Sequence, residues 1–202
     1  TYSGDNNFNS ESNIKDNLLR IFIIYSILSI VILGLLNLSG IRLFNSLNLS
    51  MTLISGGGFL PTESISKIIS TNFQKVILIF SLLVSLLNIY LLFNIFNKNT
   101  LIKEHREDLY LIILSIIFCS FIYFNNYNGL DIIISVLSSL ANSGLTLMES
   151  QNNLSLYFLL ITIIGGSIFS NTSGIKLTRF YILLKITSLE IIKLISPNSI
   201  IN

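Results

Sequence analysis

The chain has 202 residues, of which 51% are hydrophobic and 11% are charged, and its mean hydropathy is +0.75. Soluble domains carry about 25% charged residues, so the composition excludes an ordinary soluble domain and a disordered chain, and it indicates a membrane protein. The net charge of +2 is too small to suggest a nucleic-acid partner, and a single cysteine, Cys119, excludes an internal disulfide.

Four apolar runs are predicted as membrane-spanning helices, each of which needs about 20 mostly apolar residues. In chain order they cover residues 18–36, 76–96, 109–124 and 154–169. Residues 97–108 form the one strongly polar linker. A small, polar stretch, GGSIFSNTSG, follows the fourth run, and residues 175–195 are apolar again but carry five charged side chains. We therefore expect an all-α, multi-pass protein of the cell (plasma) membrane.

Two further apolar runs, residues 43–54 and 130–141, are too short to span. Helices of this length reach about 18 Å, roughly half of the hydrocarbon core, so they are predicted to be re-entrant or interfacial. Asn45 and Asp131 lie near their starts, where they suit helix N-caps. Each run is followed by a glycine-containing loop, SGGGF at residues 55–59 and NSGL at residues 142–145.

The order of long run, short run, glycine loop and long run occurs twice, which predicts an internal duplication. Gly58 and Gly144 are 86 residues apart, and each lies 13 residues after the polar residue near the start of its short run. Glu63 and Glu149 each follow these glycines by five residues. If both ends of each repeat are cytoplasmic, nine of the twelve basic residues lie inside, which places the glycine loops on the outer face.

A half-depth helix that stops at glycine suits cation binding. Its C-terminal end carries partial negative charge, and glycine allows the following backbone to turn carbonyl oxygens towards an ion. Rings of such carbonyls replace the hydration shell of potassium. Glu63 and Glu149 suit either an outer mouth that attracts cations or simple solvated loop charges. The oxygens predicted to form the filter belong to Ser55, Gly56, Gly57, Gly58, Asn142, Ser143 and Gly144.

The broken fourth run is predicted to form an intramembrane gate, because a flexible polar insert at membrane depth must lie against a cavity. Lys176 suits two roles equally: it either repels cations when the gate is shut or extends to the cytoplasmic interface. The predicted gating residues are Gly165, Gly166, Ser170, Asn171, Thr172, Ser173, Gly174 and Lys176. No nucleophile–base pair and no metal-ligand spacing occurs in the sequence, so we expect neither an enzyme nor a cofactor.

Residues 163–185, IIGGSIFSNTSGIKLTRFYILLK, resemble the signature of the Trk/Ktr potassium-uptake membrane subunits, IGG-x-x-GST-x-GG-[IL]-K-x-x-R. SGGGF and SLANSGLTL resemble the filter strands of that family's second and third repeats, and ISPNSI resembles the segment that follows its signature. The positions identical to the signature are Ile164, Gly165, Gly166, Ser170, Gly174, Ile175, Lys176 and Arg179.

The resemblance implies a potassium-channel-like fold in which four membrane–pore–membrane repeats surround one pseudo-fourfold pore. The chain then supplies the second repeat at residues 1–97, a cytoplasmic linker at 98–108, and the third repeat at 109–202 with its gating loop at 165–176. It is therefore expected to be a fragment or to be completed by other chains. The resemblance also implies potassium as the substrate, a homodimer, and a cytosolic nucleotide-binding regulatory subunit.

The gating loop departs from the family pattern at Phe169, Asn171, Thr172 and Ser173, and the second filter loop departs at Asn142, Ser143 and Leu145. These departures leave open whether potassium or sodium is selected and which ion is coupled. They also motivate an alternative function, a non-transporting membrane scaffold or degenerate relative. An intramembrane enzyme is the weakest alternative, because no acid–base constellation is present.

Overall fold

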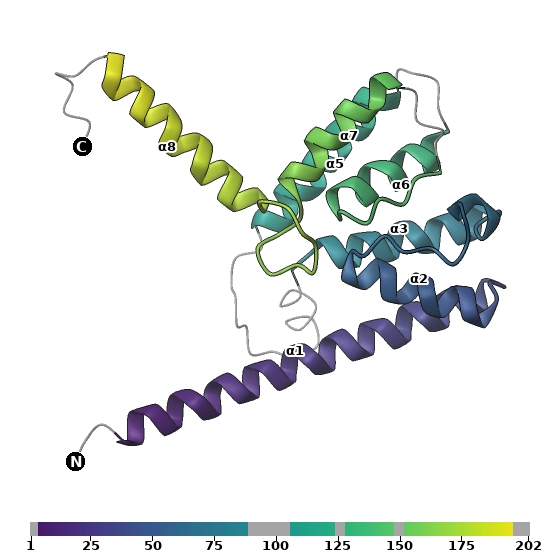
Figure 1. Ribbon diagram of the computed structural model, residues 1–202, viewed down its shortest axis with the longest axis horizontal. Helices are drawn as coiled ribbons and strands as arrows, with labels where there is room; N and C mark the ends of the chain where they lie inside the picture. The colour runs from purple at the N-terminus through teal and green to yellow at the C-terminus, as the bar shows by residue number, and fades with distance from the viewer. Residues whose placement is uncertain (1–3, 89–105, 124–127, 148–151, 196–202) are drawn as a thin grey trace.

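The computed structural model describes residues 4–88, 106–123, 128–147 and 152–195, and all of its regular elements are helical. Helix α1 (Gly4–Leu38) is followed by the half-length α2 (Leu43–Ser55), a 3-10 turn η1 (Ile65–Lys67) and α3 (Asn72–Leu86). The second group comprises α5 (Arg106–Tyr123), the half-length α6 (Gly129–Leu140) and α7 (Asn152–Ile164). Helix α8 (Leu177–Ile195) follows the break after α7 (Figure 1).

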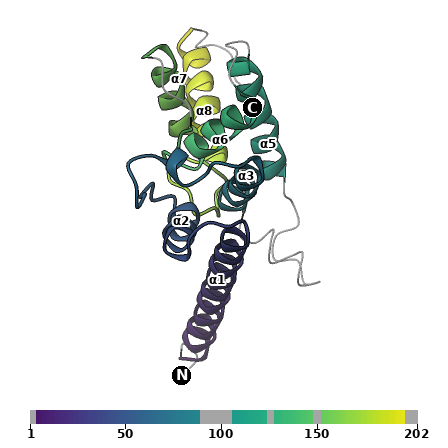
Figure 2. The same cartoon turned by 90° about the vertical axis from the view of Figure 1, so that its right-hand side faces the viewer.

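Each half-length helix packs against the longer helices of its own group. Helix α2 contacts α1 and α3, whereas α6 contacts α5 and α7. The two groups are joined mainly by the packing of α3 on α6, which lie side by side in both views (Figures 1 and 2). The short helices therefore lie near each other at the centre of the molecule, and their C-terminal ends approach the same region (Figure 1).

The packed interior is made of aliphatic side chains at the contacts between these helices. Leu36 of α1, Leu49 and Leu53 of α2, and Leu78 and Leu82 of α3 are fully buried. Helices in lipid associate through close van der Waals packing, so these contacts hold α2 against its neighbours. Many large apolar side chains on the outer surfaces of α1, α5, α7 and α8 are instead exposed, as expected of faces that contact lipid.

Local signals explain where the elements begin and end. Helix α3 starts with a capping box, in which the Thr71 hydroxyl accepts from the Gln74 N–H and the Gln74 side chain accepts from the Thr71 N–H. The Gln74 amide also donates to the Ser39 carbonyl at 3.2 Å, which ties α3 to the α1–α2 turn. The predicted N-caps of the short helices are wrong by three residues, because Arg42 and Asn128 hold those positions.

The long helices differ in detail from the predicted spans. Among the described residues, one helix segment, Leu18–Leu38, is long and apolar enough to cross a membrane. Helix α3 ends at Leu86, and the later part of the predicted span at 76–96 lies outside the described residues beyond residue 88. Helix α7 ends at Ile164, five residues before the predicted end, because Gly165 adopts a left-handed conformation. Helix α5 begins at Arg106, so the end of the predicted linker is helical.

The N-terminal part of α1 and the whole of α8 project from the packed centre, towards the lower left and the upper left of the view (Figure 1). Helix α8 has no buried residue, and within the described residues its main packing neighbour is α5. The number of membrane crossings therefore remains a prediction from the sequence.

Candidate ion pathway

The first glycine loop is a tight turn at the C-terminal end of α2. Gly56 adopts a left-handed conformation with φ of 65°, and its N–H and that of Gly57 both bond to the Thr52 carbonyl. The Thr52 hydroxyl donates to the Phe59 carbonyl at 2.9 Å, which returns the loop to the helix. Gly58 is also left-handed, with φ of 69°, so the chain reverses over three glycines.

The second loop is built differently at the end of α6. Asn142 and Gly144 adopt positive φ values of 56° and 64°. The Ser143 N–H donates to the Ser138 carbonyl at 3.0 Å, and the two serine hydroxyls lie 3.0 Å apart. The Asn142 amide donates to the Thr162 carbonyl at 3.1 Å, so α7 fixes the position of this loop.

The two loops are in direct contact. A Cβ atom at Gly58 would lie only 2.5 Å from the Ser143 carbonyl oxygen, and one at Gly56 would lie 3.0 Å from the Ala141 carbonyl oxygen. The C-terminal ends of α2 and α6 therefore present their partial negative charges to one small region. All seven residues of the predicted filter lie in this pair of loops.

The acidic residues after the loops lie in different settings. Glu63 is highly exposed and forms a 2.5 Å ion pair with Lys67, which offsets its charge. Glu149 lies outside the described residues. Asp131 instead pairs with Lys75 at 2.6 Å, and both side chains are more than four-fifths buried. This second pair joins the start of α3 to the first turn of α6, which fixes the second short helix against the first group.

The predicted gating loop leaves α7 and returns to the same point. The Ile175 N–H donates to the Ile163 carbonyl at 3.0 Å, and Gly165 and Gly174 lie against each other at the neck. A Cβ atom on Gly165 would lie 2.4 Å from the Ser173 carbonyl oxygen, and one on Gly174 would lie 2.8 Å from the Gly165 Cα. Both glycines have positive φ, so neither neck position accommodates a side chain.

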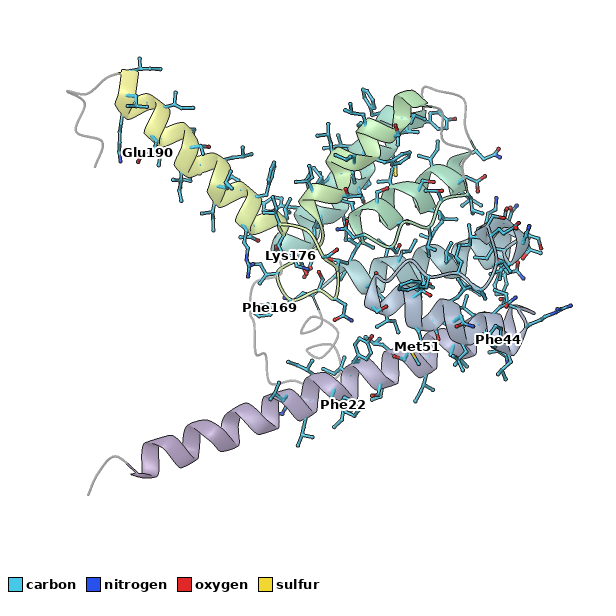
Figure 3. The ribbon with its side chains drawn as sticks, viewed as in Figure 1. Phe22, Phe44, Met51, Phe169, Lys176 and Glu190 are labelled. Atoms are coloured by element: carbon cyan, nitrogen blue, oxygen red, sulfur yellow. The ribbon has the colours of Figure 1, made fainter. Side chains whose placement is uncertain are left out.

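The predicted gating loop at residues 165–176 lies beside the first glycine loop at residues 55–59. A Cβ atom at Gly56 would lie 4.0 Å from the Asn171 carbonyl oxygen, and the Ser167 N–H donates to the Leu86 carbonyl at the end of α3. The loop therefore contacts both the candidate filter and the helix that supports it. Figure 3 shows Phe169 and Lys176 in this region, close to the start of α8.

Glu107 links the loop at residues 165–176 to the first turn of α8, a contact that the sequence analysis missed. One carboxylate oxygen accepts from the Ile168 N–H and the other from the Thr178 N–H, both at 3.3 Å. Thr178 lies in the first turn of α8, where a carboxylate is favourable. The available signal was a pair of acidic residues directly before an apolar run. Asp108, the residue after Glu107, is buried, and its carboxylate accepts a hydrogen bond from the Asn88 N–H at 3.0 Å.

Lys176 turns its side chain into the gating loop. Its ammonium bonds to oxygen atoms of Ser170 and Thr172. The residue itself adopts a left-handed conformation with φ of 74°, which is rare for a side chain of this size. Its role, whether repelling cations in a closed gate or extending to the cytoplasmic interface, stays a prediction.

A solved transporter structure has a similar arrangement of helices. The chain is 20% identical to the potassium transporter TrkH from Vibrio parahaemolyticus, with a TM-score of 0.80 over 93% of this chain and 44% of that chain. The chain has the TrkH fold. The sequence-based resemblance and the prediction of an all-helical membrane fold are confirmed at that level. No protein-family model matches the chain.

A curated relative is similar over nearly the same length. The chain is 28% identical over 182 residues to an uncharacterized cation transporter of Methanocaldococcus jannaschii, covering 89% of this chain and 37% of the relative. The chain thus spans less than half of either protein. Both matched proteins are named as transporters, and neither is named as an enzyme.

Proposed function

We propose that the chain forms part of a potassium-translocating membrane subunit of the Trk/Ktr type. The observation that carries the proposal is the contact between the glycine loops of the two half-length helices, where Gly58 lies against the Ser143 carbonyl. Likeness to the fold of TrkH and similarity to a cation transporter support the same conclusion. The cation is potassium in this proposal, and it is a substrate rather than a resident cofactor.

Backbone carbonyls of the two loops replace water around the cation. The left-handed residues at Gly56, Gly58, Asn142 and Gly144 allow successive peptide groups to turn their oxygens to one side. The converging C-terminal ends of α2 and α6 lower the electrostatic energy of a positive charge there. Selection depends on the number and arrangement of the oxygens, so the close fit of the loops fixes the field that the cation experiences.

The loop at residues 165–176 acts as the gate on the cytoplasmic side of the filter. It contacts the candidate filter at Gly56 and is held by Leu86 and Glu107. A cavity of about 560 Å³ lined by Glu107, Tyr110, Leu177, Thr178 and Tyr181 lies beside its attachment to α8.

Two further repeats of the same kind complete the pore, because two loops supply only half of a fourfold ring. By the same resemblance, the subunit forms a homodimer in the cell membrane, with several membrane crossings, and docks on a cytosolic nucleotide-binding regulator. These assemblies are part of the proposal and depend on segments beyond the two described helical groups.

Growth on limiting potassium tests the proposed function. The full-length gene is expected to rescue a potassium-uptake-deficient host, whereas Gly58→Asp and Gly144→Asp abolish rescue because each puts a carboxylate and a Cβ at a left-handed filter position. Gly34→Ala is the matched control, because Gly34 lies within α1 with no atom near its missing Cβ. Rescue that persists in both aspartate variants rejects the filter. Absence of rubidium flux in the unmodified, folded protein favours the scaffold alternative.

A further inference from the structure

The ammonium of Lys176 donates hydrogen bonds to neutral oxygens of its own loop, and the charges of Glu107 and Arg179 also act on it. Its Nζ lies 3.3 Å from the Ser170 carbonyl oxygen, 3.2 Å from the Ser170 hydroxyl and 3.2 Å from the Thr172 hydroxyl. It also donates to the Thr172 carbonyl. Two residues thus supply four oxygens, two from the main chain and two from side chains, to one monovalent cation.

The two hydroxyl groups are arranged so that their lone pairs face the ammonium. Ser170 Oγ donates its proton to the Ser167 carbonyl at 2.7 Å, which leaves its lone pairs free to accept. Thr172 Oγ1 accepts from the Gly166 N–H at 3.1 Å and lies 2.8 Å from Ser170 Oγ, to which it donates. Each oxygen then has one lone pair left for a cation, and the network contains no unused donor that points at the site.

The backbone is shaped to build this arrangement. A Cβ atom at Gly166 would lie 2.4 Å from Thr172 Oγ1 and 2.7 Å from Ser170 Oγ, so only glycine leaves room for both hydroxyls. Lys176 adopts a left-handed conformation, which is unfavourable for a residue with a side chain. Such a conformation persists where surrounding contacts stabilise it, and here the four oxygen contacts supply that stabilisation.

We propose that the oxygens of Ser170 and Thr172 form a binding site for a monovalent cation, which the Lys176 ammonium occupies as a tethered substitute. The inference rests on the proposed function only for the placement of the site on the conduction path. Carbonyl and hydroxyl oxygens without carboxylates suit weakly hydrated monovalent ions such as potassium, rubidium and ammonium, whereas calcium and magnesium are usually bound by carboxylates. The lysine and the transported ion therefore compete for one set of oxygens.

This competition gives the gate a chemical basis. While the ammonium occupies the site, an ion that leaves the filter meets an occupied set of oxygens and a positive charge. When the ammonium leaves, the same oxygens can accept the ion, so opening exchanges one monovalent cation for another. The loop oxygens then keep a cationic partner when the loop opens, because ion–oxygen contacts replace the hydrogen bonds from the lysine.

Equilibrium dialysis with radioactive rubidium tests the site on purified full-length protein in detergent. Lys176→Met removes the ammonium but keeps an unbranched side chain, and it is expected to bind one rubidium ion per chain more than the unmodified protein. Lys176→Arg keeps a tethered cation and is expected to bind no additional ion. Adding Ser170→Ala and Thr172→Val to Lys176→Met is expected to weaken the additional site about 10-fold, because two oxygen contacts are lost.

Unlabelled ammonium is expected to displace the additional rubidium ion, since the site already accommodates a lysine ammonium. Equal rubidium binding by the methionine variant and the unmodified protein overturns the proposal, as does an additional ion that is bound equally tightly after loss of both hydroxyls. If the methionine variant does not fold, Lys176→Gln is measured in its place with the same expected gain. The combined variant Gly58→Asp with Lys176→Met separates the filter proposal from the loop-site proposal. It is expected to lose transport but to keep the additional rubidium ion at the loop.

Discussion

The contact between Gly58 and the Ser143 carbonyl can be tested by comparing two substitutions, Gly58→Ala and Gly144→Ala, that each add one methyl group. Gly58 and Gly144 both have left-handed backbones, with φ of 69° and 64°. An alanine at either position therefore costs about 1–2 kcal/mol in backbone strain. Only Gly58 is crowded: its Cβ would lie 2.5 Å from Ser143 O, whereas no atom lies within 4 Å of a Cβ at Gly144.

The additional cost at Gly58 follows from this difference. The Ser143 carbonyl must move about 0.9 Å to reach ordinary contact at 3.4 Å, and this carbonyl is itself a candidate ion ligand. Forcing an extra methyl group into a packed site costs about 1–3 kcal/mol. We therefore expect Gly58→Ala to lower rubidium uptake about 5- to 150-fold more than Gly144→Ala, the range that corresponds to this free-energy difference.

Rubidium uptake by reconstituted vesicles, normalised to the amount of monodisperse protein, measures this difference. Potassium-to-sodium selectivity is measured in the same vesicles, because displacement of the carbonyl alters the ligand field as well as the amount of folded protein. Equal uptake by the two alanine variants, or a larger loss with Gly144→Ala, refutes the placement of Gly58 against the second loop.

Two further predictions concern the supports of the filter and the gate. Glu107→Gln is expected to weaken the two contacts that hold the predicted gating loop by about 1 kcal/mol in total, which raises rubidium flux about 5-fold. The control Glu190→Gln, on the exposed part of α8, is expected to leave flux unchanged. Unchanged flux in both variants contradicts a holding role for Glu107. Lys75→Met breaks the pair with Asp131 and is expected to lower the free energy of chemical unfolding by about 2 kcal/mol. The exchanged pair, Lys75→Asp with Asp131→Lys, is expected to recover at least half of that loss. An exchanged pair that is less stable than Lys75→Met rules out a direct ionic contact.

The glycine positions explain much of what the sequence can predict at the site. Apolar runs of 12 residues that end in glycine indicated the half-length helices, and the structure places α2 and α6 within one residue of the predicted bounds. Hydrophobic length and helix-breaking residues are local properties, so they can be read without knowledge of the fold. The loop at residues 165–176 was predictable for the same reason.

The partners of charged side chains were not predictable from local pattern. Glu107 was assigned to a polar linker, yet it contacts residues 61 and 71 positions later in the chain. Lys75 and Asp131, 56 positions apart, became a largely buried pair. A carboxylate before an apolar run has the same local sequence whether it faces water or caps a distant helix, so only the packed structure distinguishes the two settings.

The sequence by itself determined that the chain is a helical membrane protein with two half-length helices and a broken final segment, because hydrophobic length and glycine positions act within each segment. Tertiary structure alone decided that the two glycine loops meet, that Glu107 contacts the loop at residues 165–176, and that the Lys176 ammonium lies among the oxygens of that loop. These contacts depend on how separate helices pack, and electrostatic and steric fit between distant residues has no signature in a short stretch of chain.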